Sequence, residues 1–412
     1  MFRMWWYNLG IHAFDGAARI LALWKPKAAA WCDGRKGIFE RMRSAIDPNC
    51  DIIWVHAASL GEFEQGRPVI EALRRTHPEY KILLTFFSPS GYEIRKNYSG
   101  ADYVFYLPTD TPSNVRRFMD IVRPKIAIII KYEFWLNYLS ELRRRGCRTY
   151  IISSIFRRNS IFFKPYGWAF RRALKSFDTL FVQNDESVEL LASIGISNVE
   201  KAGDTRFDRV ADIASKAKKI EEIEKFAAGR KVFVAGSTWP QDEELIVRLA
   251  NEHRDTKFII VPHEIEPQRI DRMAESIQGG AVRYTRAGQC DRTAEAQVMI
   301  VDTVGILSSV YSYAHYAYIG GGFGVGIHNT LEAATFSLPL AFGPNYTKFQ
   351  EAVDLIRLGA AKSVDSYKQI EEWFSALHDD ENLRKRQGDL AGEYIRQNKG
   401  ATEKIVSHIF SK

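Results

Sequence analysis

The sequence predicts an α/β protein with two doubly wound parallel sheets, one in each half of the chain. In both halves, short apolar runs typical of buried parallel strands alternate with helical patterns. A stretch rich in lysine and glutamate at 214–231, with few large apolar residues, separates the two series. The chain has 412 residues, which is long enough for two separate cores. We therefore expect two domains with a ligand-binding cleft between them.

The elements expected in the first half follow one another with short connections. Apolar runs predict strands at 52–55, 81–86, 103–106, 126–130, 149–153 and 179–182. Helical patterns occupy 113–122, 134–145 and 185–194, and the last two stop at a glycine. Residues 88–91 read Ser-Pro-Ser-Gly and predict a turn.

The second half repeats this alternation after the linker. Strands are expected at 232–235, 258–261, 297–301, 317–319 and 338–342, with a helix at 243–251 and a helical tail over 370–412. The predicted organisation is an N-terminal segment 1–45, a first domain 46–213, a linker 214–230, a second domain 231–395 and a C-terminal helix 396–412.

The N-terminal segment 1–45 has the pattern of a helix that lies on a membrane surface. Charged side chains interrupt its apolar runs before they are long enough to cross a bilayer. The residues typical of an interfacial helix are the aromatic Trp5, Trp6, Tyr7 and Trp24 and the basic Lys25, Lys27, Arg35 and Lys36. The alternative is that this helix packs on its own domain.

The overall charge suits an acidic partner but does not identify one. The formal net charge of +7 fits nucleic acid, an anionic membrane or a phosphorylated substrate, and it also fits a mildly basic enzyme. Residues 155–175 interleave aromatic and basic side chains, as nucleic-acid and lipid-binding surfaces do. A helix with one core face and one solvated face gives the same pattern. The four cysteines lack metal-site spacing, so we expect free thiols.

The segment from His56 to Arg67 is the first candidate site. It follows an apolar strand and precedes a helical pattern, so it predicts a strand, a tight loop and a helix. Small residues such as Ser59 and Gly61 let a ligand approach the backbone. Glu62 then lies near a helix N-terminus at the end of a strand, where α/β sheets place ligands. The alternative role for Glu62 is to cap the helix and stabilise its dipole.

A glycine-rich loop in the second half is the second candidate site. Gly320, Gly321 and Gly322 follow an expected strand, and a loop of this kind before a helix can bind an anion through its N–H groups. Asn329 and Glu332 are spaced i, i+3, which places them on one helix face. The loop lies too late in its half for a dinucleotide-binding motif. A capped helix with a solvated glutamate is the alternative.

Two further segments lie beside these loops in the expected topology. Gly236, Ser237 and Thr238 end the first strand of the second half, in the same way that residues 56–61 end a strand of the first. Arg206, just before the linker, can reach a phosphate or carboxylate, or it can pair with Asp208. We find no Walker loop, no His/Cys metal cluster and no acidic triplet after a strand, which favours a reaction without a divalent metal.

Six segments together resemble the 3-deoxy-D-manno-octulosonic acid (Kdo) transferases of Gram-negative bacteria. They are residues 56–66, 131–135 (Lys-Tyr-Glu-Phe-Trp), 203–208, 236–239, 320–322 and 328–333 (His-Asn-Thr-Leu-Glu-Ala). They occur in the family's order over nearly the whole chain. Ser-Leu-Gly-Glu early in the chain combined with His-Asn-x-Leu-Glu-Ala late is specific to this family.

The resemblance implies a GT-B glycosyltransferase with two Rossmann-like domains. It implies inverting, metal-independent transfer of Kdo from CMP-Kdo to a phosphorylated lipid A precursor at the cytoplasmic face of the inner membrane, with no cofactor and no nucleic-acid partner. Glu62 aligns with the family's general base, and Glu64 is its nearest competitor. Donor contacts are implied for Gly236, Ser237, Thr238, His263, Gly320, Gly321, Gly322, Asn329, Glu332 and Arg206. Acceptor contacts are implied for Ser59, Gly61, Ser88 and Glu133.

Departures from the family pattern lie mostly on the acceptor side. Leu136 stands where proline is common, and Phe86 and Phe87 stand where threonines are usual. Around His263, residues 262–267 read Pro-His-Glu-Ile-Glu-Pro where the family often has Arg-His-Pro-Glu-Arg. Two other functions stay open from the residues alone. One is a GT-B enzyme that uses a UDP-sugar, and the other is a basic nucleic-acid or membrane-binding protein without catalysis.

Overall fold

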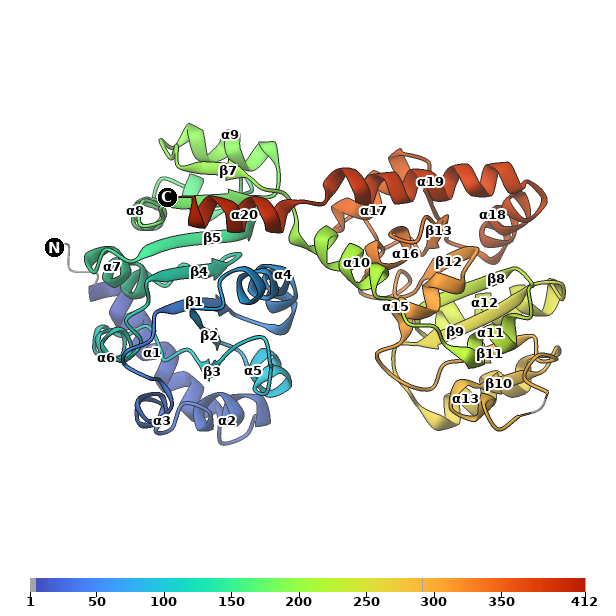
Figure 1. Cartoon of the computed structure of the whole chain (residues 1–412), viewed down its shortest axis with the longest axis horizontal. Coiled ribbons are helices and arrows are strands. Elements are labelled where there is room, and N and C mark those ends of the chain that lie inside the picture. The colour runs from blue at the N-terminus through green and yellow to red at the C-terminus, as the bar shows by residue number, and fades with distance from the viewer. Residues whose placement is uncertain (1–4, 291, 412) are drawn as a thin grey trace. The chain divides into compact units, whose positions relative to one another are not determined.

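The computed structural model describes residues 5–290 and 292–411 and divides into two compact units (Figure 1). The first unit runs as far as Arg209 and also contains the C-terminal residues from Lys399 onward. The second unit is Val210–Asn398. The first four residues of the expected membrane segment lie outside the described residues.

These boundaries correct the predicted organisation in two places. The expected linker 214–230 belongs to the second unit, because α11 (Glu221–Ala227) buries Ile223 and Phe226 completely. The C-terminal helix α20 (Ala401–Phe410) is not a separate part, because it packs on α4 (Leu60–Thr76) in the first unit. The last connection of the chain therefore returns it to the unit where it began.

The first unit is built on a seven-stranded parallel sheet in the order β3-β2-β1-β4-β5-β6-β7. Its strands are β1 (Ile52–Ala57), β2 (Lys81–Phe86), β3 (Tyr103–Tyr106), β4 (Ile126–Ile130), β5 (Arg148–Ser154), β6 (Thr179–Val182) and β7 (Val199–Lys201). Its other helices are α1 (Trp5–Leu21), α2 (Pro26–Asp33), α3 (Ile38–Ala45), α5 (Pro89–Arg95), α6 (Pro112–Val122), α7 (Leu136–Arg144), α8 (Trp168–Leu174) and α9 (Asp185–Ser193). Helix α10 (Thr205–Ser215) crosses the division between the units.

Alternating side chains of the central strands build two cores, one on each face of this sheet. Ile52 and Trp54 pack among residues of α3, α6 and α7. Ile53 and Val55 face the other way and pack among residues of α4 and α20. Both faces are therefore covered, as the apolar strands predicted, and the sheet is doubly wound.

The second unit repeats this plan with a seven-stranded parallel sheet in the order β10-β11-β9-β8-β12-β13-β14. Its strands are β8 (Val232–Thr238), β9 (Lys257–Pro262), β10 (Ala281–Arg283), β11 (Val298–Ile300), β12 (Tyr316–Ile319), β13 (Leu340–Phe342) and β14 (Ala361–Ser363). Its remaining helices are α12 (Pro240–Glu252), α13 (Pro267–Ser276), α14 (Tyr284–Ala287), α15 (Leu307–Val310), α16 (Leu331–Ala334), α17 (Gln350–Arg357), α18 (Tyr367–Asp379) and α19 (Glu381–Asn398). The predicted α/β class with two Rossmann-like domains is confirmed.

The order of the strands reverses at one point in each sheet. In the first unit the neighbours at this point are β1 and β4, and in the second they are β8 and β12. Open α/β sheets bind ligands at the carboxyl ends of the strands beside such a point. The loops after these four strands carry most of the predicted site residues.

Helix α1 is present as predicted, and its apolar side chains are largely exposed. None of its seventeen residues, all of them described, is buried, and Trp5 and Leu9 are 67% and 61% exposed. In the described part of the chain we find no helix with the length and apolarity to span a bilayer. Arg35, expected at the membrane surface, instead donates to the carbonyl oxygens of Trp31, Phe87 and Leu107, so it fastens the N-terminal helices to the loops after β2 and β3.

The return of α20 to the first unit makes a prediction about stability. Ile405 is fully buried in the core beneath α4, whereas Glu403 on the same helix is exposed. We expect Ile405→Ala to destabilise the first unit by about 2–5 kcal/mol, and Glu403→Ala to change it by less than about 0.5 kcal/mol. Hydrogen exchange followed by mass spectrometry in a urea series measures both units separately. Equal destabilisation of the second unit by Ile405→Ala would contradict this division of the chain.

Candidate active site

Glu62 lies in the first turn of α4, immediately after the loop that ends β1. Its Oε2 accepts a hydrogen bond of 2.6 Å from the backbone N–H of Ala58. A carboxylate in a first turn is stabilised by the positive end of the helix dipole. The expected capping role is therefore real, although Ser59, and not Glu62, holds the N-cap position.

Glu133 lies in the loop between β4 and α7 and is held from two sides. Its Oε2 accepts a hydrogen bond of 2.6 Å from the indole N–H of Trp135 and lies 3.3 Å from Nε2 of His56. The Glu133 side chain is 16% exposed. Since β1 and β4 are neighbours, the loops that carry Glu62 and Glu133 emerge side by side at the same edge of the sheet.

A buried chain of hydrogen bonds behind Glu133 holds the ring of His56 in place. Trp54 donates from its indole N–H to Oγ1 of Thr85 at 2.8 Å, and Thr85 Oγ1 lies 2.9 Å from Nδ1 of His56. A carboxylate only accepts hydrogen bonds, so Nε2 of His56 carries the proton that points at Glu133. Nδ1 also lies 3.1 Å from the backbone carbonyl oxygen of Thr85. This arrangement orients Glu133 from inside the sheet.

The two carboxylates influence each other electrostatically. Burial raises the pKa of Glu62, and the nearby charge of Glu133 raises it further. The Ala58 N–H and the positive charges of His56 and Lys131 oppose this rise in pKa. A carboxylate with a raised pKa binds a proton more strongly, which is what a general base requires.

Other predicted residues of the first unit lie at the same carboxyl edge of the sheet. The backbone N–H of Ser88 donates to the carbonyl of Ala58 at 2.8 Å, which joins the loops after β1 and β2. Ser88 is the N-cap of α5, so the expected turn at 88–91 is the first turn of a helix. A side chain on Gly61 would meet nothing within 4 Å, so this position leaves open space beside Glu62. Glu64 instead forms an ion pair with Arg95 at 2.7 Å.

Two other predictions are revised by their surroundings. Arg206 pairs with Asp204 at 2.7 Å, and not with Asp208, whose carboxylate accepts from the N–H groups of Gly400 and Thr402. In the segment 155–175, Phe156 and Phe162 are buried in the first-unit core. Tyr166 and Trp168 of the same segment are instead 71% and 46% exposed, so its aromatic side chains divide between the core and the surface.

In the second unit, Asp242 organises the loops after β8 and β12. Its carboxylate accepts hydrogen bonds from the N–H groups of Trp239 and Gly321, both at 2.9 Å, and from the hydroxyl of Tyr318 at 2.8 Å. The N–H of Gly321, expected to face an anion, is therefore already bound by this carboxylate. Thr238 is also engaged, because its hydroxyl donates to Glu243. Sequence analysis missed Asp242 because its partners lie up to 79 residues away.

The glycines of this loop allow backbone segments to meet. A Cβ on Gly322 would lie 2.6 Å from Gly343, and one on Gly320 would lie 2.3 Å from the carbonyl oxygen of Ser237. Gly321 adopts φ 92°, a conformation that side chains rarely allow. The structure thus gives these glycines a packing role at the carboxyl edge of β8, β12 and β13.

An aromatic and imidazole stack stands beside this loop. The ring of His263 lies 4.9 Å from that of Trp239 and 4.3 Å from that of His328. The indole N–H of Trp239 donates to Nε2 of His328 at 3.0 Å. Burial, together with the charge of His263, lowers the pKa of His328 to about 4, so this ring is neutral at pH 7. Trp239 and His328 were not among the predicted site residues.

Asn329 and Glu332 are in contact, but they do not share a helix face as predicted, because Asn329 precedes α16 (Leu331–Ala334). The Asn329 amide donates to Oε1 of Glu332 at 3.0 Å, and Ser308 donates to Oε2 at 2.9 Å. Glu332 lies in the first turn of α16, a helix of only four residues.

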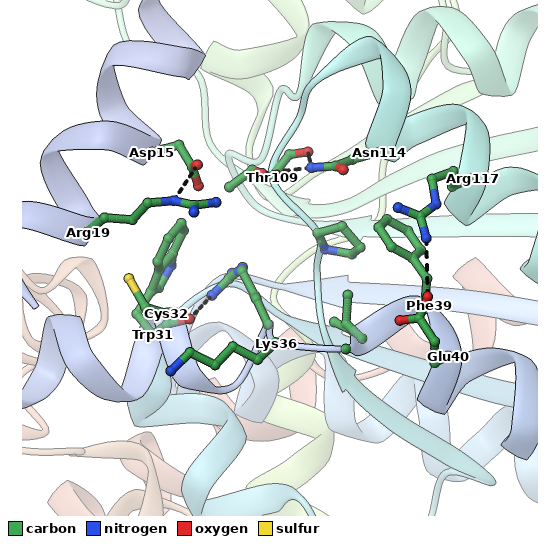
Figure 2. Close-up of a pocket in the computed structure, with 14 residues that line it drawn as sticks. Asp15, Arg19, Trp31, Cys32, Lys36, Phe39, Glu40, Thr109, Asn114 and Arg117 are labelled. Carbon is green, nitrogen blue, oxygen red and sulfur yellow. Dashed lines mark hydrogen bonds and ion pairs between the residues drawn. The ribbon is translucent and has the colours of Figure 1, made fainter.

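A separate cavity of about 380 Å³ lies between the N-terminal helices and α6 in the first unit (Figure 2). Four of its charged side chains form two ion pairs: Arg19 with Asp15 at 3.0 Å, and Arg117 with Glu40 at 3.4 Å. None of the predicted site residues lines this cavity. Among the described residues, no cluster of three or more His, Cys, Asp or Glu side chains is placed to hold a metal ion.

Comparison with known proteins places this geometry in a family. A family model for 3-deoxy-D-manno-octulosonic-acid transferase (kdotransferase) matches residues 32–209. The 3-deoxy-D-manno-octulosonic acid transferase of Aquifex aeolicus is 30% identical over 315 residues, which cover 75% of this chain and 80% of the relative. That of Bordetella pertussis is 27% identical over 421 residues, which cover 96% of both chains.

Solved structures show the same fold at lower identity. UDP-GlcNAc 2-epimerase from Neisseria meningitidis has a TM-score of 0.62 at 16% identity, covering 88% of this chain and all of its own. MurG of Acinetobacter baumannii has a TM-score of 0.55 at 11% identity, with the same coverage. This likeness shows the GT-B fold.

The close contact at Gly322 makes a testable prediction. Because a Cβ there would strike the backbone of Gly343, we expect Gly322→Ala to destabilise the second unit by about 1–3 kcal/mol. Gly324, in the same loop, has only one neighbouring atom, at 3.7 Å, so Gly324→Ala serves as the matched control. Urea unfolding of the two variants measures the difference. Equal stability would show that the loop adapts freely and that the glycine is not needed for packing.

Proposed function

The chain belongs to the 3-deoxy-D-manno-octulosonic acid (Kdo) transferase family, and from this premise we propose the donor, the acceptor and the catalytic base. It is a glycosyltransferase that transfers Kdo in lipopolysaccharide biosynthesis. We propose CMP-Kdo as the donor, a phosphorylated lipid A precursor as the acceptor, and a metal-independent reaction that inverts the anomeric configuration.

The observation that carries this proposal is the environment of Glu62. It lies at the strand reversal of the first sheet, partly buried, with a pKa raised by burial and by Glu133. A sugar hydroxyl is a poor nucleophile and needs a base to remove its proton. Glu64, by contrast, is paired with Arg95 and Arg67. Glu62 is therefore the better candidate for the base.

The proposed step is a single displacement. The acceptor oxygen forms a bond to the anomeric carbon of Kdo while the bond from that carbon to the phosphate oxygen of CMP breaks. The hydroxyl proton passes to Glu62, and CMP leaves with the bonding electrons as an anion. One displacement from the face opposite the leaving group inverts the configuration. The nearby charge of Glu133 raises the pKa of Glu62 and so increases its affinity for the proton.

We assign donor binding to the second unit. The candidates are Gly236, Ser237, Thr238, His263, Gly320, Gly321, Gly322, Asn329 and Glu332, with Arg206 of the first unit as a further candidate. Asp242 and the glycine contacts give these loops a fixed shape, which favours binding of a nucleotide. The stacked rings of Trp239 and His263 are suited to contact a flat base.

We assign acceptor binding to the first unit, with Ser59, Gly61, Ser88 and Glu133 beside the base. The exposed apolar side chains of α1 and the nearby Trp24, 69% exposed, support contact with a membrane. Lys25 and Lys27, which follow directly, favour an anionic surface. A peripheral position at the cytoplasmic face of the inner membrane is the location we propose.

Replacement of the base gives the direct test of function. We expect Glu62→Gln to lower turnover by about 10²- to 10⁴-fold while CMP-Kdo still binds, because only proton removal is lost. Mass spectrometry of the lipid product after incubation with CMP-Kdo measures transfer and counts the sugars added. Glu64→Gln is the control, and UDP-sugars serve as the alternative donors. Wild-type turnover by Glu62→Gln would exclude Glu62 as the base, and transfer only from UDP-sugars would exclude the donor.

The pH dependence tests the influence of Glu133. Glu62 must be ionised to act, so activity is lost as the pH falls through its pKa, which lies above the ordinary value of about 4.3. Glu133→Gln removes the neighbouring negative charge, so the acidic limb of kcat/KM is expected to move to lower pH. The Gln side chain retains an oxygen that accepts from Trp135. An acidic limb that stays in place or moves to higher pH would refute the electrostatic coupling.

A further inference from the structure

Helix α1 is attached to the first unit by few contacts. None of its residues is fully buried, and the side chains of Tyr7, Asn8 and Phe14 contact the rest of the unit. The Tyr7 hydroxyl donates to Oδ2 of Asp110 at 2.6 Å, and Oδ1 of Asn8 accepts from the Asn137 amide at 2.8 Å. The Phe14 ring lies 6.0 Å from that of Phe87. It also lies 5.6 Å from the ring of Trp31 in α2. The position of α1 therefore depends on polar contacts with the start of α7 and on the aromatic contacts of Phe14.

Those same polar groups cap the N-terminus of α7. The N-cap residue, Trp135, provides no side-chain cap of its own. Instead, the N–H of Asn137 donates to Oδ2 of Asp110 at 3.1 Å, and that of Tyr138 donates to Oδ1 at 3.0 Å. The N–H of Leu136 donates to the Tyr7 hydroxyl at 3.3 Å. The N–H groups at the start of a helix need such partners, and here they come from distant parts of the chain.

The capped turn is continuous with the loop that carries Glu133. Trp135 directly precedes Leu136, and its indole N–H holds Glu133 at 2.6 Å. The Trp135 ring also packs 4.8 Å from that of Phe87, which in turn contacts Phe14 of α1. Two routes, one polar and one aromatic, thus connect α1 with the loop of Glu133.

We propose that Tyr7 and Asp110 are positioning residues for the transfer reaction, which fix the start of α7 and thereby hold Glu133 beside Glu62. The proposal rests on the proposed function for the role of Glu62 as base. If these residues act in this way, the geometry of Glu62 and Glu133 depends on how α1, the helix assigned to the membrane, packs on the first unit. Contact between α1 and lipid then helps to hold the loop of Glu133 in one conformation.

Burial suits Asp110 to this task. Its carboxylate is 1% exposed and accepts from one hydroxyl and two backbone N–H groups. Burial raises the pKa of Asp110 to about 7, although these three hydrogen bonds favour the ionised form. The charged and titratable groups that face Glu62 are Glu133 and Lys131 from the loop after β4, His56 from β1, and Tyr132. Displacement of the Glu133 loop removes a negative charge from this set, so the pKa of Glu62 falls.

Kinetics of the full-length chain in detergent with CMP-Kdo and lipid acceptor test the proposal. We expect Tyr7→Phe and Asp110→Asn each to lower kcat about tenfold or more, to change KM for CMP-Kdo less than about twofold, and to shift the acidic limb of the rate profile to lower pH. Tyr80→Phe, near the amino edge of the sheet, and Asp120→Asn, paired with Arg145 on the surface, are the matched controls. Both controls are expected to behave as wild type.

Amide hydrogen exchange of residues 131–138 without substrates provides a readout that does not depend on activity. Faster exchange at Leu136, Asn137 and Tyr138 in Tyr7→Phe supports the proposal even if the reaction proves to be a different one. Unchanged exchange in this segment overturns it. A fall in kcat that is accompanied by lower thermal stability and an unshifted acidic limb also overturns it, because the two residues would then serve only the stability of the fold.

Discussion

The carboxylate pair of Glu62 and Glu133 is the interaction on which the chemistry of the first unit depends. The fold brings the two acids together because β1 and β4 are neighbours where the strand order reverses. Two negative charges in a partly buried place repel each other, and each needs its own compensation. Glu62 has the Ala58 N–H and a helix N-terminus, whereas Glu133 has Trp135 and His56. Groups at the carboxyl edge of the sheet thus stabilise both carboxylates.

In the second unit, the buried carboxylate of Asp242 holds two loops together. Asp242 joins the loops after β8 and β12 by accepting hydrogen bonds from their backbone N–H groups. Glycines let the loop after β12 pack against the backbone of Gly343, directly after β13. Each of these contacts is short-ranged and directional, so the loops have a defined shape before any ligand binds. A preorganised loop loses less conformational entropy on binding than a mobile one.

The fold was largely predictable from sequence because buried parallel strands are continuous apolar runs. The strands at 81–86, 103–106, 126–130 and 179–182 have the predicted bounds. The linker prediction failed because α11 buries only Ile223 and Phe226 beneath a face rich in glutamate and lysine. Glu62 and the Asn329–Glu332 contact were found because local spacing determines them. The contacts of Asp110 were not predicted, because its partners lie 27–103 residues away. The contacts of Asp242 with Tyr318 and Gly321, at 76–79 residues, and those of Arg35 with Phe87 and Leu107, at 52–72 residues, were missed for the same reason.

The titration of Glu62 itself is the most direct test of this account. Carbon-13 NMR of the side-chain carboxyl groups in the folded full-length chain, with Glu62 assigned by comparison with Glu62→Gln, gives its pKa without any substrate. We predict a midpoint clearly above the ordinary glutamate value of about 4.3, because burial and the charge of Glu133 both favour the protonated form. A midpoint at or below that value would contradict the view that this site is built to strengthen a base.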